Sequence, residues 1–178
     1  KKFGPFAYTA KLRNGLFRNT GACLSPQNAF YNSIGMETLG LRMERVCDNA
    51  KTLAQFFATE YSDIEVNYPG LAGSKWHNIA TEQFGDKFGG IITIRTGNKK
   101  RAFGIIDALK LPLIVSNIGD TKTLVIHPES TLNVHSTQEE KETAGVFDDL
   151  IRISVGIEDI DDLIDDFKQA IESVKDVY

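Results

Sequence analysis

The chain has 178 residues and a formal net charge of -4, with 42% hydrophobic and 25% charged residues. These values are typical of one globular domain, or of one domain with an arm, and no basic stripe is present that could follow a nucleic-acid backbone. No apolar run is long enough to span a bilayer, and the N-terminus lacks the apolar segment of a signal peptide, so we expect a cytoplasmic protein that is not in a membrane.

Residues 1–25 form a polar and basic segment in which Asn14 and Gly15 interrupt any helical pattern. We expect this segment to be an arm, or the remnant of a cofactor domain, that packs on polypeptide outside this chain. The main domain is expected to cover residues 26–178, because the first strong helix start stands at its beginning.

A helix is predicted to begin at Ser25 and Pro26, because a hydroxyl cap followed by proline at the first position favours helix initiation. Apolar residues then recur at helical spacing to about Tyr61. Gly35 and Gly40 interrupt the pattern, so we expect two helices or one long bent helix. The apolar residues expected on one side are Ile34, Leu41, Val46, Leu53 and Phe57.

Short alternating runs and helical runs interleave in the rest of the chain, which predicts an α/β domain, an α+β sandwich. We expect a small sheet, rich in antiparallel pairs, with helices on one face. The predicted strands are 64–68, 91–95, 113–115, 124–126 and 150–155. The predicted helices are 76–84, 99–109, one from Thr137 to about Gly145, and one capped by Asp159. The early turns of this last helix carry a predicted solvated acidic face, namely Asp161, Asp162, Asp165 and Asp166.

The cysteines and histidines indicate neither a metal site nor a catalytic nucleophile. Cys23 and Cys47 each lie in an apolar-periodic stretch, so we expect both to be reduced and buried, with a disulfide between them as the alternative. His77, His127 and His135 show no spacing typical of metal ligands. We therefore expect no metal.

Two features could carry chemistry. Arg152 stands in the alternating run Leu150–Val155, where its guanidinium could clamp a carboxylate by two parallel hydrogen bonds, the alternative being a surface or salt-bridged arginine. The loop Ser116–Asp120 follows a predicted strand, and its small polar residues could offer N–H groups to an anion. An ordinary turn is the alternative there.

The same two segments carry a resemblance to a known family. The run 150–159 (LIRISVGIED) closely resembles the C-terminal signature of the Cys/Met-metabolism enzymes that depend on pyridoxal 5'-phosphate (PLP), and 116–128 (SNIGDTKTLVIHP) resembles the signature before it. Blocks within 24–45 and 66–71 follow in the order of the family. The Asn-x-Gly-Asp form at 117–120 resembles the O-acetylhomoserine sulfhydrylases, whereas cystathionine synthases and lyases usually have Ser-Leu-Gly-Gly.

The resemblance implies the C-terminal domain of a fold-type I PLP enzyme. Such an enzyme performs a γ-replacement on O-acetylhomoserine with sulfide or a thiol, and is expected to be a homo-oligomer when intact. Its Schiff-base lysine and cofactor ligands lie in an N-terminal domain that nothing here matches, so this chain is expected to hold no catalytic or cofactor-binding residue, and Lys122 is expected to be a surface lysine. Arg152 and Asn117 are implied to bind the substrate carboxylate. Further residues expected to line the site are Ser116, Gly119, Thr131 and Ser154.

One departure from the family leaves the substrate open, because Leu132 and Asn133 stand where the family commonly has a Thr-His pair. The alternatives are therefore a cystathionine γ-synthase or γ-lyase of the same family. A non-catalytic module that binds carboxylates or mediates assembly is a third reading. A fragment whose exposed apolar face drives self-association is a fourth.

Overall fold

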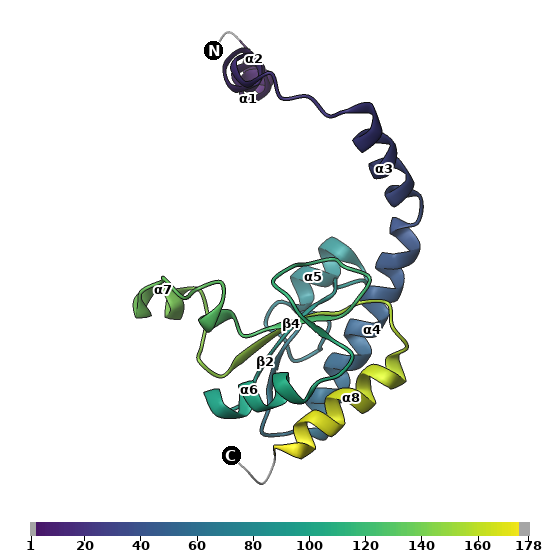
Figure 1. Ribbon diagram of the computed structural model, residues 1–178, viewed down its shortest axis with the longest axis vertical. Coiled ribbons are helices and arrows are strands. Elements are labelled where there is room, and N and C mark those ends of the chain that lie inside the picture. The colour runs from purple at the N-terminus through teal and green to yellow at the C-terminus, as the bar shows by residue number, and fades with distance from the viewer. Residues whose placement is uncertain (1–2, 175–178) are drawn as a thin grey trace. The chain divides into compact units, whose positions relative to one another are not determined.

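The computed structural model describes residues 3–174, which form two compact units with their boundary between Leu39 and Gly40. The domain boundary predicted after residue 25 falls inside the first unit, and the predicted domain bounds stay a prediction. Within the described residues, no helix combines the length and the apolar character that crossing a membrane requires. Figure 1 shows the order of the elements along the chain.

The first unit is a series of short helical pieces without a core. Its elements are η1 (Gly4–Phe6), α1 (Ala7–Leu12), the π-helical η2 (Arg13–Phe17), α2 (Arg18–Thr20) and α3 (Pro26–Glu37). Asn14 and Gly15, which interrupt the helical pattern, lie in the π-helical turn. No residue described in this unit is buried. Its exposed large apolar side chains include Phe6, Tyr8, Leu16, Phe17, Phe30, Tyr31, Ile34 and Met36.

The predicted interruption of the long helical stretch is confirmed. The Ser25 hydroxyl accepts from the backbone N–H of Asn28, with proline at the first position of α3. Thr38 leaves helical geometry, and α4 (Leu39–Glu60) follows. The predicted apolar side is buried only in part. Val46, Leu53 and Phe57 are buried, whereas Ile34 and Leu41 are exposed.

The second unit is built on a five-stranded sheet in the order β1-β2-β5-β4-β3. The strands are β1 (Glu65–Asn67), β2 (Ile91–Arg95), β3 (Leu113–Ile114), β4 (Leu124–Ile126) and β5 (Leu150–Ser154). The pairs β1–β2, β2–β5 and β5–β4 are antiparallel, and β3–β4 is parallel. The predicted antiparallel-rich sheet is therefore confirmed.

Three helices pack on one face of this sheet, as the sequence predicts. They are α4, α6 (Lys99–Ala108) and α8 (Ile160–Ser173), and Figure 1 shows α4 and α8 side by side. The rings of Phe57 on α4 and Phe167 on α8 meet edge to face, with centroids 5.2 Å apart. Alternate strand residues complete this core, namely Ile92, Ile94, Val125, Ile151 and Ile153.

The opposite face of the sheet carries the polar residues of the strands. Thr93 on β2 and Ile126 on β4 stand directly opposite Arg152 on β5, one on each side. Residues paired in this way point to the same face. Because the neighbouring residues Ile151 and Ile153 enter the core, Arg152 is directed to the face that α4, α6 and α8 leave free.

The remaining helices lie outside this core. Helix α5 (His77–Phe84) follows the turn after β1, the 3-10 helix η3 (Pro128–Ser130) follows β4, and α7 (Gln138–Thr143) projects away from α4 and α8 in Figure 1. Thr137 and Glu140 form the predicted capping box at the start of α7. Asp159 caps α8 as predicted, accepting from the backbone N–H of Asp161.

Two predictions about burial are wrong. Asp166 does not belong to a solvated face, because it is buried and accepts from the backbone N–H groups of Lys110 and Leu111. Cys23 is exposed, whereas Cys47 is buried as predicted, and both are free thiols.

Candidate functional site

Arg152 is a half-buried arginine without a charge partner among residues 3–174. Its terminal Nη2 donates to the carbonyl oxygen of Asn117 at 3.1 Å. Its Nε is buried and has no hydrogen-bond partner. Burial lowers the pKa of the guanidinium from its ordinary value. Because no carboxylate of the described residues pairs with it, the guanidinium charge is available to an anionic ligand.

The loop before β4 meets Arg152 and Ser154 through its backbone. Gly119, with φ of 80°, donates its N–H to the Ser154 hydroxyl at 3.3 Å. The side-chain oxygen of Asn117 accepts from the N–H of Ile118 at 2.9 Å, and the expected role of Asn117 in binding a substrate carboxylate stays a prediction. Four predicted site residues thus form two neighbouring hydrogen-bonded pairs between the loop and β5, which we call the Arg152 cluster: Arg152 with Asn117, and Ser154 with Gly119.

Two other predicted site residues have no hydrogen bond to this cluster within the described part of the chain. Ser116 is exposed in the same loop. Thr131 follows η3, beyond the other end of β4, and its hydroxyl donates to the carbonyl oxygen of His127 at 2.8 Å. Their assignment to the site therefore stays a prediction.

A carboxylate fixes the base of this loop, and the sequence pattern did not single it out. Glu158 accepts from the N–H of Thr123 at 2.5 Å and from its hydroxyl at 2.9 Å. The Thr123 hydroxyl also accepts from the N–H of Gly156 at 2.9 Å. Local periodicity gives no sign of these contacts, because Glu158 and Thr123 are 35 positions apart. The only available signal was that Glu158 stands inside the run 150–159.

Helix α4 holds the turn between β5 and α8 from the other side. The buried amide of Asn49 donates to the carbonyl oxygens of Gly156 at 3.1 Å and Glu158 at 2.9 Å. Arg45 also donates to the Glu158 carbonyl, at 3.3 Å. The backbone of this turn is therefore fixed to α4 whatever the Glu158 side chain does.

A cavity of about 510 Å³ opens on the same sheet face as Arg152. Thr93, which pairs directly with Arg152, is one of its walls. Two cations line it. Arg95 pairs with the buried Asp149 at 3.0 Å and lies over the ring of Phe147 at 3.9 Å, and Lys75 lies over the ring of Trp76 at 5.0 Å. Arg95 is therefore already paired with a carboxylate, whereas Arg152 has no charge partner among the described residues.

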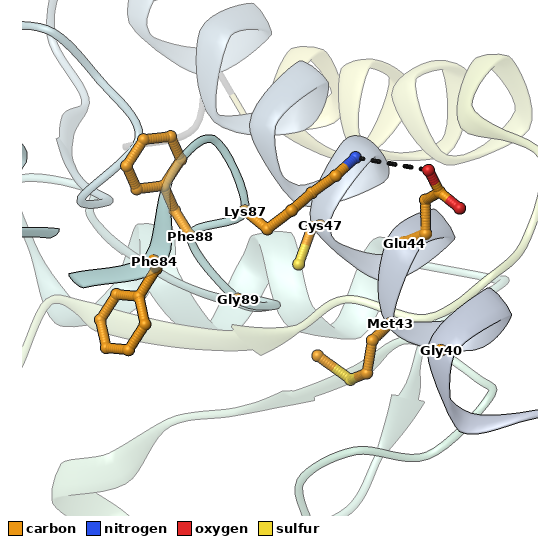
Figure 2. A pocket seen from close by; sticks show the side chains of 8 residues that line it. All are labelled: Gly40, Met43, Glu44, Cys47, Phe84, Lys87, Phe88 and Gly89. Carbon is orange, nitrogen blue, oxygen red and sulfur yellow. Dashed lines mark ion pairs between the residues drawn. The ribbon is translucent and has the colours of Figure 1, made fainter. Parts of the chain in front are cut away.

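A second cavity, of about 560 Å³, is apolar and does not suit an amino-acid substrate (Figure 2). Met43 and Cys47 of α4 and Phe84 and Phe88 line it. Lys87 lies along its rim and is matched by two acidic groups of α4, Asp48 at 2.7 Å and Glu44 at 4.0 Å.

Lys122 does not fit a covalent anchor for PLP. Lys122 is exposed in a turn, and its N–H donates to Asp120 at 3.0 Å, which holds the pKa of that carboxyl below its usual range. Among the described residues, no group of three or more His, Cys, Asp or Glu side chains could hold a metal ion. His77 and His127 instead contact backbone carbonyl groups, of Pro69 and Asp148.

Comparison with known proteins gives one family. The family described as Cys/Met metabolism PLP-dependent enzyme matches residues 6–172. The O-acetyl-L-homoserine sulfhydrylase of Corynebacterium glutamicum is 39% identical over 173 residues, which is 96% of this chain and 39% of that protein. The L-methionine gamma-lyase of Fusobacterium nucleatum subsp. polymorphum is 40% identical over 161 residues, 90% of this chain and 40% of that protein.

A solved structure shows the same fold. It is described as an O-acetylhomoserine (thiol)-lyase of Campylobacter jejuni that contains N'-pyridoxyl-lysine-5'-monophosphate, and it superimposes with a TM-score of 0.86 and 39% identity. The match covers 93% of this chain and 39% of that one. This chain therefore spans about two-fifths of the length of the relatives that it matches.

Proposed function

Since this chain belongs to the Cys/Met-metabolism PLP-dependent enzymes, we propose that it is the substrate-binding C-terminal part of an O-acetylhomoserine sulfhydrylase. The intact enzyme replaces the acetate of O-acetylhomoserine by sulfide or a thiol, which gives homocysteine or a related amino acid. PLP supplies the electron-withdrawing ring for this chemistry when it is bound. In this proposal PLP is anchored by residues outside these 178.

The proposed task of this chain is to hold and orient the amino acid. The Arg152 guanidinium receives the α-carboxylate of the substrate by two parallel hydrogen bonds, in a bidentate pair. Asn117 and Ser154 assist indirectly, because the Asn117 carbonyl and the Gly119–Ser154 hydrogen bond fix the loop beside the arginine. Fixing the carboxylate fixes the direction of the remaining substrate bonds, which is catalysis by positioning.

One observation carries this proposal, namely that no carboxylate among the described residues pairs with the half-buried Arg152. A structural arginine of this burial would normally be paired with a carboxylate. Arg101 also has an unmatched Nε, but its terminal nitrogen is paired with Asp63 at 2.6 Å. Arg152 differs because it keeps its positive charge available to a ligand.

Replacing Arg152 tests the function. In the intact enzyme, Arg152→Ala should raise KM for O-acetylhomoserine at least about 30-fold, because losing one partner of a buried charged hydrogen-bonded pair costs about 2–5 kcal/mol. Steady-state kinetics at varied substrate concentration measure this. Arg152→Lys should recover only part of the affinity, since lysine cannot form the bidentate pair.

The control is Lys168→Ala, which removes an exposed cation from α8. This variant should leave KM unchanged. An Arg152→Ala enzyme with the KM of the parent protein would remove Arg152 from the site and refute the proposed role of this chain.

A second candidate is a γ-lyase, because the similarity to the L-methionine gamma-lyase is as high as that to the sulfhydrylase. The Asn117-x-Gly119-Asp120 form supports the sulfhydrylase. Feeding the intact enzyme O-acetylhomoserine with sulfide, O-acetylhomoserine with cysteine, and methionine alone separates the sulfhydrylase, the cystathionine γ-synthase and the lyase. The predicted homo-oligomer and cytoplasmic location belong to this proposal, and mass measurement and cell fractionation test them.

A further inference from the structure

We infer that Glu158 is a positioning residue for the substrate carboxylate, acting through Thr123 and the 116–122 loop on Arg152. The inference rests on the proposed function, because it concerns how the arginine of that site is held in place. Glu158 itself contacts no Arg152 cluster residue in the structure, so any effect it has on substrate must pass through the loop.

The first step of the argument is the double hydrogen bond between Glu158 and Thr123. Both carboxylate oxygens are used, one by the Thr123 N–H and one by its hydroxyl. Thr123 is fully buried and is the residue at which the loop enters β4. Two hydrogen bonds accepted by one charged group fix both the position and the orientation of this entry point.

The second step is the close approach of the loop to the turn after β5. Gly156 lies so near the loop that an added Cβ would meet the carbonyl oxygen of Thr121, the backbone carbon of Lys122 at 2.6 Å, and the Glu158 carboxylate. The N–H of Ile157 donates to the Thr121 carbonyl at 2.9 Å. The two segments are therefore in direct contact at the point where Glu158 joins them.

The third step of the argument concerns the hydrogen bonds between the 116–122 loop and the strand that holds Arg152. Residues 116–122 are all exposed, so burial does not fix their conformation. The polar contacts that the described structure shows from this loop to β5 are those of Asn117 with Arg152 and of Gly119 with Ser154. If the base of the loop at Thr123 is released, both contacts lose their fixed partner, and the Arg152 guanidinium loses the carbonyl that orients it.

The turn itself does not depend on the Glu158 side chain. Asn49 and Arg45 hold its backbone carbonyl groups from α4. Removing the Glu158 carboxylate should therefore loosen the loop, which keeps the hydrogen bonds from the N–H groups of Gly156 and Ile157, while leaving β5 and α8 in place. This separates a positioning role from a general structural one, which would instead weaken the whole unit.

The test uses two variants of the intact enzyme, Glu158→Gln and Thr123→Val, with Thr123→Ser as the conservative variant that keeps the hydroxyl. We expect the first two to raise KM for O-acetylhomoserine about tenfold, the effect of one misplaced charge-assisted hydrogen bond, with kcat at saturating substrate changed less than about twofold. Thr123→Ser should restore KM to within about twofold. Glu82→Gln, which changes an exposed carboxylate on α5, is the matched control and should have no effect.

The double variants with Arg152→Ala show whether the effect passes through the arginine. Adding Glu158→Gln to Arg152→Ala should raise KM by less than about twofold more, because the group that Glu158 positions is already gone. If the two substitutions instead raise KM by factors that multiply in the double variant, the inference is wrong. A lower melting temperature with an unchanged KM, which is the sign of a purely structural role, would also overturn it.

The outcomes also separate this inference from the proposed function. If Arg152→Ala leaves KM unchanged, the proposed function fails. If Arg152→Ala raises KM but Glu158→Gln and Thr123→Val do not, only the role of Glu158 is refuted. If Thr123→Val does not fold, Glu158→Gln with its double variant decides the matter alone.

Discussion

At the scale of single residues, Glu129 joins three separate segments of the second unit. From η3 it accepts from Lys99 of α6 at 2.9 Å and from Lys141 of α7 at 2.5 Å. The hydrogen bonds from Lys141 and Lys99 lower the pKa of its carboxyl to about 2. Because α7 projects from the rest of the unit, the ion pair between Lys141 and Glu129 is an important attachment of this helix.

This network predicts a pH-dependent contribution to stability. The folded-state pKa of about 2 lies below the ordinary value of 4.5, so the contribution is present above pH 4.5 and is lost as the pH falls toward 2. Glu129→Gln should lower the free energy of unfolding by about 0.5–1 kcal/mol at pH 7, because the pair is partly exposed to solvent. Urea unfolding at pH 7 and pH 3 measures it. A difference between parent and variant that does not shrink at pH 3 would contradict this assignment.

The residue scale also shows what the sequence could not predict about the site. The spacing in 150–155 placed Arg152 on a strand and away from the core, since a period of two is a local property. Its partner is the backbone carbonyl of Asn117, and Glu158 pairs with Thr123 at the base of the same loop. Those contacts join segments 35 positions apart. The backbone contact of Asn117 could not be predicted for the same reason, because backbone and side-chain roles in a loop depend on the final geometry.

At the scale of elements, the starts of the helices could be predicted where a capping residue marks them. Ser25 with Pro26, Thr137 with Glu140, and Asp159 each begin a helix as expected. The predicted solvent exposure of Asp166 on α8 is wrong. Its burial depends on the end of α6, which lies far away in sequence. Helical periodicity records which residues share a side but not what covers that side.

Asp166 links α8 to the chain that leaves α6. Its carboxylate accepts from two successive backbone N–H groups, those of Lys110 and Leu111. Because Asp166 is buried, we expect that water would not fully satisfy these two N–H groups if the carboxylate were removed. Asp166→Ala should lower the free energy of unfolding by about 1–3 kcal/mol, the usual cost of leaving such donors unsatisfied. Thermal or urea unfolding measures this.

The matched control for this prediction is Asp165→Ala, which removes the neighbouring exposed carboxylate. It should change the stability by less than about 0.5 kcal/mol. Equal losses for the two variants would mean that the carboxylate of Asp166 has no special role and that the acidic face acts only through its total charge.

At the scale of the whole molecule, the two units differ in the burial of their apolar side chains. The second unit buries a core between α4, α6, α8 and the sheet. No residue described in the first unit is buried, although it carries exposed Phe, Tyr, Leu and Met side chains. Exposed apolar groups in this number are typical of surfaces that another polypeptide covers.

The chain of 178 residues should therefore self-associate when it is produced alone. We expect its apparent mass to rise with concentration in sedimentation velocity, and a hydrophobic dye to fluoresce strongly on it. Replacing Phe6, Phe17 and Phe30 together by Ser should reduce both signals, because each of these side chains is more than half exposed. A parent chain that stays monomeric and does not raise the fluorescence of the dye would contradict this prediction.

The strand order has a consequence for synthesis. Strand β5, the last to leave the ribosome, stands in the middle of the sheet between β2 and β4. A nascent chain that has not yet reached Leu150 holds two half-sheets with unpaired edges, each open to association with other chains. The strand that presents Arg152 is thus also the one that closes the sheet, so a translation product that stops short of it lacks the arginine and the centre of its sheet together.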